Sequence, residues 1–231
     1  MNVYWLEQTQ AHPPLSDAWL SAAESHLMSR LRFAKRHADW RLGRWTAKLA
    51  IATYLNVAPD FQTLALLEIL PQPSGAPRAL FDSMPLPITI SISHSAGMAI
   101  CAMASHLAPM GCDLELIEPR ADSFVADYFT ADEQELIAGA DDTDRDLRVT
   151  LLWSAKESAL KAIGEGLRID TRCVAVIPHL ASRPLVDWQP LKVQRADGQP
   201  YYGWWQTSGP FVQTVVSAST CNPPVWLGKT A

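Results

Sequence analysis

The sequence has few cysteines, no long hydrophobic run and no leading basic segment. Only four of its 231 residues are cysteine, none of them in a CxxC pair and each in an apolar stretch. This usage predicts reduced, buried thiols in a cytosolic protein and argues against a disulfide framework. No apolar segment approaches the ~20 residues that a helix needs to span a bilayer, and no signal peptide is visible at the amino terminus. We expect a cytoplasmic protein without a membrane partner.

The sequence also lacks an overall excess of positive charge. Its net charge is −5 and its pI is about 5.6, whereas a general nucleic-acid binder is usually basic, so we expect no nucleic-acid partner. The cations are concentrated instead. Seven of them fall within nineteen positions: Arg30, Arg32, Lys35, Arg36, Arg41, Arg44 and Lys48. This concentration indicates a compact anionic ligand rather than a long polyanion.

Hydrophobic residues make up 48% of the chain and charged residues 19%, as in an ordinary globular protein. The patterns predict helices over 15–31 with Ser16 as N-cap, 39–54, and 148–163 ending at Gly164, and a partly helical acidic stretch over 132–146. Strands are predicted over 3–6, 64–70, 88–93, 98–103, 111–117, 174–177, 191–195, 201–206 and 212–218. This mixture predicts an α+β fold.

A weak internal echo divides the chain. The segment Trp45-Thr46-Ala47-Lys48 resembles Trp153-Ser154-Ala155-Lys156, about 108 positions later, and each is followed by a β segment of small residues. Such an echo favours two similar halves packed as a pseudo-dimer, although chance similarity is the alternative. We predict an amino-terminal subdomain over 1–109 and a carboxyl-terminal subdomain over 110–231. Two halves in one chain favour a monomer.

Two carboxylates stand one residue apart in the predicted strand over 111–117. Alternate residues of a strand share a face, so Asp113 and Glu115 project together and repel each other. A hard cation such as Mg²⁺, which prefers oxygen ligands, would remove that repulsion. The alternative is an edge strand with a solvated acidic face.

The helix over 148–163 carries a third acid. Its apolar residues share one face, and Glu157 and Lys161 lie one turn apart on the opposite face. They could form a surface ion pair worth only a few tenths of a kcal/mol. They could instead supply a further metal carboxylate and a cation for phosphate, as phosphoryl chemistry requires.

Two cationic features precede these acids. Arg41, Arg44 and Lys48 fall within a ~60° arc at the helical period, which is either a solvated stripe or an anion-binding face. His94 ends an apolar strand at a turn, a common place for ligand groups, although a lone histidine is also often structural.

Together these segments resemble the Sfp-type 4′-phosphopantetheinyl transferases, including the enterobactin-pathway branch. The matching segments keep the family order between about residues 30 and 170, at 41–48, 75–77, 92–95, 111–115, 128–133 and 153–161. The resemblance implies the 4′-phosphopantetheinyl transferase fold, in which two similar α+β halves in a pseudo-twofold arrangement have the active site between them.

The resemblance also implies roles for individual residues. Asp113, Glu115 and Glu157 would hold Mg²⁺ against the pyrophosphate of coenzyme A. Glu157 would accept the proton of the incoming serine hydroxyl, with Glu133 as the alternative base. The phosphates of coenzyme A would be bound by basic side chains. Lys161 would contact the pyrophosphate and Lys156 would also face phosphate. Arg44 and His94 would bind the 3′-phosphate or its neighbours, with Arg36 and Arg41 as weaker candidates.

The implied reaction is a Mg²⁺-dependent transfer of 4′-phosphopantetheine from coenzyme A to a serine of an acyl or peptidyl carrier protein, releasing adenosine 3′,5′-bisphosphate. Carriers of fatty acid and of secondary metabolite biosynthesis both remain open. One alternative is a Mg²⁺-dependent nucleotide or phosphate-ester hydrolase, which would use the same carboxylates and cations. Another is a non-catalytic coenzyme A-binding module, which would not need a base.

Overall fold

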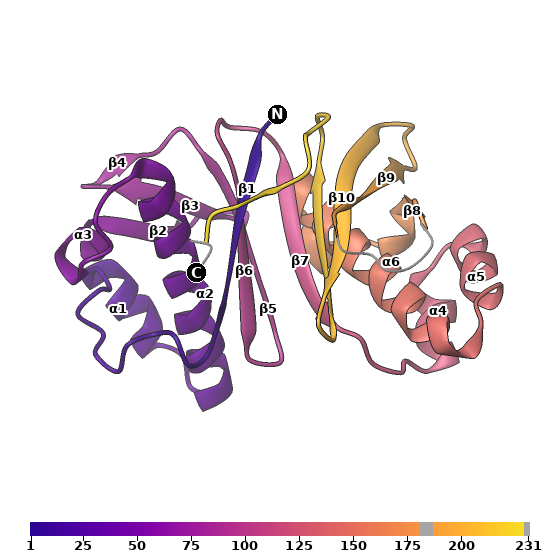
Figure 1. Ribbon diagram of the computed structural model, residues 1–231, viewed down its shortest axis with the longest axis horizontal. Helices are drawn as coiled ribbons and strands as arrows, with labels where there is room; N and C mark the ends of the chain where they lie inside the picture. The colour runs from indigo at the N-terminus through magenta and orange to yellow at the C-terminus, as the bar shows by residue number, and fades with distance from the viewer. Residues whose placement is uncertain (181–186, 229–231) are drawn as a thin grey trace. The chain divides into compact units, whose positions relative to one another are not determined.

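The computed structural model describes residues 1–180 and 187–228, which form two compact units (Figure 1). The amino-terminal unit contains Asn2–Ala108 and the short strand β12 (Val225–Trp226), and the carboxyl-terminal unit contains Pro109–Pro224. Each unit combines sheet and helices, so the predicted α+β class is confirmed. All residues after 109 were predicted to lie in the second half, but β12 pairs with β1, the first strand of the chain.

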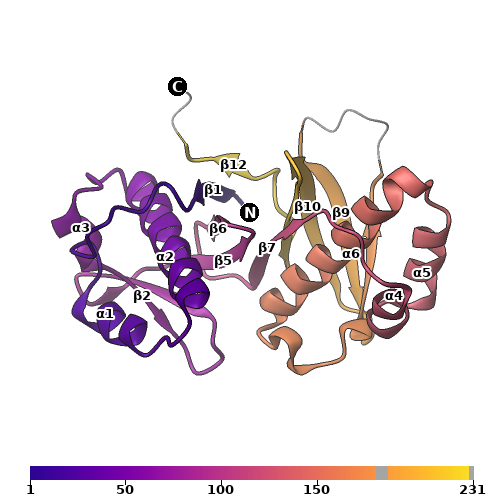
Figure 2. The ribbon, with the colours of Figure 1, turned by 90° about the horizontal axis from the view of Figure 1, so that it is seen from below.

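The amino-terminal unit is built on a four-stranded sheet with the order β12-β1-β6-β5. Figure 2 shows the long helix α2 lying along one face of this sheet, where it packs on β1 and β6. A smaller sheet, β2-β3-β4, and two short helices complete the unit. The bounds are β1 Val3–Thr9, α1 Ala22–Ser29, α2 Ala34–Leu55, α3 Phe61–Leu66, β2 Leu67–Pro71, β3 Pro77–Phe81, β4 Met84–Pro85, β5 Thr89–Ser95 and β6 Met98–Ala104.

The carboxyl-terminal unit is built on an antiparallel five-stranded sheet with the order β7-β11-β10-β9-β8. Helix α6 packs along one face of this sheet, against β7 and β11 (Figure 2). The bounds are β7 Met110–Leu116, α4 Asp122–Tyr128, α5 Ala131–Ala138, α6 Asp142–Ile163, the 3₁₀ turns Gly166–Arg168 and Thr171–Cys173, β8 Val174–Pro178, β9 Gln189–Arg195, β10 Pro200–Ser208 and β11 Phe211–Ser217.

A glycine brings β7 unusually close to α6. A Cβ atom built on Gly111 would lie 2.1 Å from the carbonyl oxygen of Ser158 and 2.7 Å from the Cβ of Lys161. Real Cβ atoms do not approach other atoms so closely, and therefore any other residue at this position would push the strand away from the helix. Gly111 thus sets the spacing between the two elements that carry the predicted carboxylates.

Most predicted strands are present, but the first helix was predicted wrongly. Helix α1 starts at Ala22, and its N-cap is Ser21, not Ser16. Ser21 and Glu24 form a capping box in which each side chain accepts a hydrogen bond from the other residue's backbone N–H. Ser16 instead accepts a hydrogen bond from the backbone of Ala18 in a turn.

Other predictions differ at their boundaries, and the helix predicted over 39–54 begins five residues earlier, at Ala34. The predicted strand over 64–70 begins as the end of helix α3, because the Asp60 side chain caps that helix by accepting a hydrogen bond from Thr63 N. The predicted helix over 148–163 starts earlier, at Asp142, and ends as expected at Gly164, whose φ of 85° is left-handed.

Two absences expected from the sequence concern disulfide bonds and membrane-spanning helices. No disulfide joins the four cysteines, all of which lie in the described residues, although Cys173 and Cys221 are only half-buried. Among the described residues, none of the helices is apolar over a long enough stretch to cross a membrane.

The amino-terminal unit contains a buried ion pair. Lys48 of α2 and Glu24 of α1 are both completely inaccessible, with 2.5 Å between their charged atoms. The Lys48 ammonium also donates to the carbonyl oxygens of Trp19 and Leu64. The second oxygen of Glu24 accepts a hydrogen bond from the N–H of Ile69, so the pair connects two helices and a strand.

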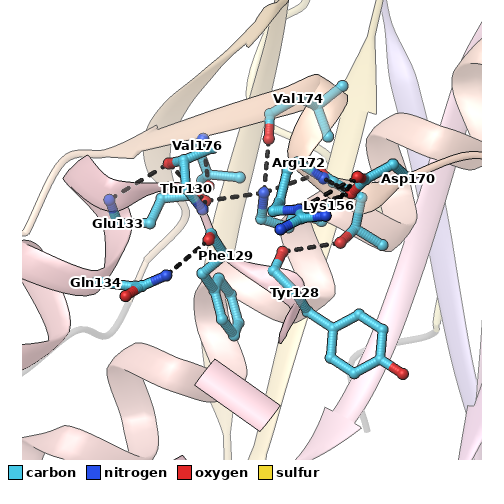
Figure 3. A network of polar contacts seen from close by, with 11 residues as sticks. Tyr128, Phe129, Thr130, Glu133, Gln134, Lys156, Asp170, Arg172, Val174 and Val176 are labelled. Carbon is cyan, nitrogen blue, oxygen red and sulfur yellow. Dashed lines mark hydrogen bonds and ion pairs between the residues drawn. The ribbon is translucent and has the colours of Figure 1, made fainter. Parts of the chain in front are cut away.

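The carboxyl-terminal unit repeats this arrangement (Figure 3). Lys156 of α6 is 2.8 Å from Glu133 of α5, and it donates to the carbonyl oxygens of Thr171 and Val174. Glu133 accepts a hydrogen bond from the N–H of Val176. Glu133, like Glu24, is the third residue of a helix with a capping box. The repeated Trp-x-Ala-Lys sequence therefore corresponds to a repeated polar contact in the core.

These pairs constrain the fold because either charged group, if buried without its partner, would destabilise the protein. Burial lowers the pKa of Lys156, and the adjacent Glu133 opposes that shift. Burial has the same effect on the pKa of Lys48, which Glu24 opposes. Removing one partner of a buried pair leaves the other charge buried without compensation, which is strongly destabilising.

We expect Lys156→Met to lower the free energy of unfolding by about 3–5 kcal/mol, because the Glu133 carboxylate stays buried without its cation. Adding Glu133→Gln should recover part of this loss, since the amide is neutral. Urea unfolding followed by tryptophan fluorescence measures both changes. The exposed Lys192→Met is the control and should change stability by no more than about 0.5 kcal/mol. A Lys156→Met loss as small as that of the control would contradict the assigned role.

Candidate functional site

Three carboxylates from two elements meet in the carboxyl-terminal unit. Asp113 and Glu115 lie on β7, and Glu157 lies on α6. One oxygen of each lies within 4.8 Å of the others. Asp113 and Glu115 point to the same side because alternate residues of a strand share a face. The strand and helix that the sequence singled out thus bring their acids together.

One lysine balances part of this charge. Lys161 of α6 donates to the Asp113 carboxylate at 2.7 Å and to the carbonyl oxygen of Cys112 at 2.9 Å. Its ammonium is also 4.0 Å from Glu157, one helical turn away. Asp113 is almost completely buried, whereas Lys161 and Glu157 remain partly accessible. The predicted surface pair of Glu157 and Lys161 is therefore part of a larger cluster.

Three acids and one lysine leave the cluster with excess negative charge. Burial and the proximity of Asp113 raise the pKa of the Glu157 carboxyl to about 7, although Lys161 lowers it. Burial and Asp113 also raise the pKa of Glu115. The possible metal ligands in the cluster are all carboxylate oxygens, with no histidine nitrogen or cysteine sulfur among them. This set fits a hard divalent cation such as Mg²⁺ better than a soft one.

Glu115 has two hydrogen-bond donors that the sequence analysis did not identify. The indole N–H of Trp153 is 3.2 Å from one carboxylate oxygen, and the guanidinium of Arg120 is 3.1 Å from the other. Trp153 is four residues before Glu157, so its side chain lies on the same face of α6; this spacing was visible in the sequence. Arg120 lies in the irregular segment after β7, and no sequence pattern indicated that its side chain would reach Glu115.

Lys156 and Glu133 do not join this cluster, and their predicted roles need correction. Lys156 is completely buried and directs its ammonium at Glu133 and the carbonyl oxygens of Thr171 and Val174, which matches its three N–H donors (Figure 3). It has no donor left for a phosphate. Glu133 is also buried and accepts hydrogen bonds from Thr130 and Val176, so it is not placed to take a proton from a substrate.

The other side chains predicted to bind phosphate lie in the amino-terminal unit, and they differ in their surroundings. Arg41 is bonded to Asp17 at 2.5 Å and to the carbonyl oxygen of Pro14, so it is committed within its own unit and its predicted phosphate role does not fit. Arg36 is exposed in the first turn of α2. Lys48, the third member of the predicted cationic stripe, is buried in its ion pair with Glu24.

Arg44 and His94 are the side chains best placed to receive a ligand in that unit. The Arg44 guanidinium lies over the ring of Trp40 at 4.6 Å, and its buried Nε has no hydrogen-bond partner among the described residues. Burial also lowers the pKa of Arg44, so an anion beside it would be stabilising. His94 is 46% exposed and lies 3.9 Å from the carboxylate of Asp39.

The chain is similar in sequence to known proteins of one family. Residues 109–208 match the sequence model of the 4′-phosphopantetheinyl transferase superfamily. The chain is 27% identical over 164 residues to the 4′-phosphopantetheinyl transferase HetI of Nostoc sp., a match that covers 70% of this chain and 67% of that protein. It is 28% identical over 138 residues to the 4′-phosphopantetheinyl transferase gsp of Aneurinibacillus migulanus, covering 52% of this chain and 55% of that protein.

The family match spans β7 to β10 and so includes the strand and the helix that carry the acidic cluster. The similarity to both relatives lies in the sequence and does not depend on the geometry of that cluster. These findings confirm the resemblance that the motifs predicted: residues 109–208 are similar to the 4′-phosphopantetheinyl transferase superfamily, and both relatives are named as such enzymes.

Proposed function

We propose that this protein transfers 4′-phosphopantetheine from coenzyme A to a serine of an acyl or peptidyl carrier protein in a Mg²⁺-dependent reaction. The observation that carries the proposal is the cluster of Asp113, Glu115 and Glu157 with Lys161 beside it. Such a cluster suits phosphoryl chemistry, in which catalysis consists mainly of positioning and charge neutralisation. The pathway, a cytoplasmic location and a monomeric state remain predictions from the sequence.

Asp113, Glu115 and Glu157 are the residues that would hold the cation. Their oxygens already lie within 4.8 Å of one another, and burial together with their mutual repulsion raises the pKa of Glu157. When bound, Mg²⁺ would neutralise charge on the pyrophosphate and on the leaving group. The protein residues remain responsible for orienting the substrate and for moving the proton.

Glu157 is the proposed base. Glu157 must be a carboxylate to bind the cation, and in that form it can accept a proton. The serine hydroxyl would lose its proton to Glu157, directly or through a water molecule, as the serine oxygen forms its bond to the β-phosphorus. The bond from that phosphorus to the leaving oxygen breaks, and adenosine 3′,5′-bisphosphate departs. Lys161 would supply positive charge beside the pyrophosphate.

Arg44 and His94 are the proposed ligands for the remaining phosphates of coenzyme A. The support comes from the buried guanidinium Nε of Arg44, which has no partner in the described structure, and from the accessibility of His94. Arg36 remains a weaker candidate, because an exposed side chain in the first turn of α2 must lose conformational freedom to bind a phosphate. Arg41 is left out of the proposed site because its bonds to Asp17 occupy it.

The transfer is tested with apo carrier proteins of fatty-acid, polyketide and peptide synthesis, coenzyme A and Mg²⁺. Mass spectrometry should show the phosphopantetheine mass added to at least one carrier. Glu157→Gln should lower kcat by about 10²-fold or more, with a smaller effect on coenzyme A binding, because it removes the base. The exposed Glu118→Gln serves as the matched control and should leave kcat within about twofold.

Three outcomes would argue against this function. Failure to modify any carrier in the panel would remove the transferase proposal. Hydrolysis of coenzyme A without a carrier would favour the hydrolase alternative. Tight coenzyme A binding with neither reaction would favour a binding module.

The raised pKa of Glu157 predicts that metal binding releases protons. At pH 6, below its pKa of about 7, Glu157 is mostly protonated in the metal-free protein and must lose this proton to bind a cation. Calorimetric Mg²⁺ titrations in buffers of different ionisation enthalpy should therefore show release of about one proton at pH 6 and almost none at pH 8.5. In Glu157→Gln this pH-dependent release should disappear. Equal release at both pH values would contradict the assigned pKa.

A further inference from the structure

Arg120 contacts the acidic cluster from the irregular segment between β7 and α4, outside the short motifs that predicted the site. Its guanidinium donates to one oxygen of Glu115 at 3.1 Å, and the second carboxylate near it, Glu118, is 3.8 Å away and 54% exposed. The Arg120 side chain is only 18% exposed. The main interaction of Arg120 is therefore with the more buried acid, Glu115, and not with its exposed neighbour.

The surroundings of Arg120 hold it in place. Its guanidinium lies 4.9 Å from the ring centre of Phe124 on α4, a cation–π contact. Its carbonyl oxygen accepts a hydrogen bond from Arg145 of α6 at 3.2 Å, which fixes the irregular segment after β7. The buried Nε of Arg120 has no hydrogen-bond partner in the described part of the chain. A buried donor without a partner is costly, so this position is not explained by stability alone.

The same aromatic group also holds the second donor to Glu115. The ring of Phe124 packs edge-on against Trp153 at 5.0 Å, and Tyr128 packs against Trp153 at 5.3 Å. The Trp153 indole in turn donates to the other carboxylate oxygen of Glu115. Two donors, each supported by Phe124, therefore fix both oxygens of one carboxylate.

We propose that Arg120, together with the Trp153 indole, is a positioning residue that holds the Glu115 carboxylate in the orientation needed to bind a divalent cation with Asp113 and Glu157. A carboxylate oxygen has two lone pairs, so a donor on one of them leaves the other open to a metal. Partners of this kind typically change metal affinity 10–100-fold when they are removed. This inference rests on the proposed metal site.

Charge and positioning make opposite predictions for Arg120. If Arg120 acted only as a nearby positive charge, removing it would strengthen the binding of a divalent cation, because a repulsive charge would be lost. If it orients Glu115, removing it weakens binding, because the carboxylate becomes free to rotate away. Direct metal binding to the protein alone can therefore distinguish the two roles without measuring activity.

The experiment titrates the 231-residue protein with Mn²⁺ alone and follows the electron paramagnetic resonance signal of the free ion. We expect the Kd for Mn²⁺ to rise about tenfold in Arg120→Gln. Trp153→Phe keeps the aromatic packing but removes the indole N–H, and it should raise the Kd several-fold. Arg120→Lys keeps the charge but loses the planar group over Phe124, and it should stay weakened. Thermal unfolding checks that each variant is folded.

The control is Glu118→Gln, which changes the other carboxylate near Arg120 and should leave the Kd within twofold. Unchanged or tighter Mn²⁺ binding in a folded Arg120→Gln would overturn the positioning role, as would full recovery in Arg120→Lys. If the unmodified protein itself fails to bind Mn²⁺, or if Glu157→Gln binds it equally well, the metal site of the proposed function fails instead.

Discussion

The candidate site depends on the close approach of strand β7 to helix α6. Gly111 permits this approach, since a Cβ at that position would collide with the backbone of Ser158. Two residues further along the strand, Asp113 reaches Lys161, and Glu157 lies within the same cluster. Without this spacing the strand acids would not share a cation with the helix acid. The positive charge of Lys161 offsets only part of their repulsion, which favours a divalent cation there.

Helix α6 carries two lysines with different roles, although they are only five residues apart. Lys156 points into the core, where Glu133 and two carbonyl oxygens take up its donors. Lys161 lies near the surface and contacts Asp113. A helix turns by about 100° per residue, so five positions separate the side chains by roughly 140°. One face of the helix thus stabilises the unit while the other presents groups for chemistry.

The amino-terminal unit contains the same kind of buried lysine, and this explains the sequence echo in physical terms. In both units a capping-box glutamate forms an ion pair with a lysine of the long helix and accepts a hydrogen bond from a backbone N–H of a strand. The repeated residues therefore preserve a buried polar contact rather than a repeated ligand site. The two-halved, pseudo-twofold arrangement implied by the family resemblance stays a prediction.

The fold class, most strands and the pairing of Asp113 with Glu115 could be predicted from the sequence, because side-chain alternation and hydrophobic periodicity are local properties. The sequence also placed Glu157 and Lys161 on one face of a helix. The burial of Lys156 with Glu133 and the hydrogen bond from Arg120 to Glu115 became visible only in the three-dimensional fold. Those outcomes depend on contacts between residues distant in sequence or joined by irregular backbone, and no local period encodes such contacts.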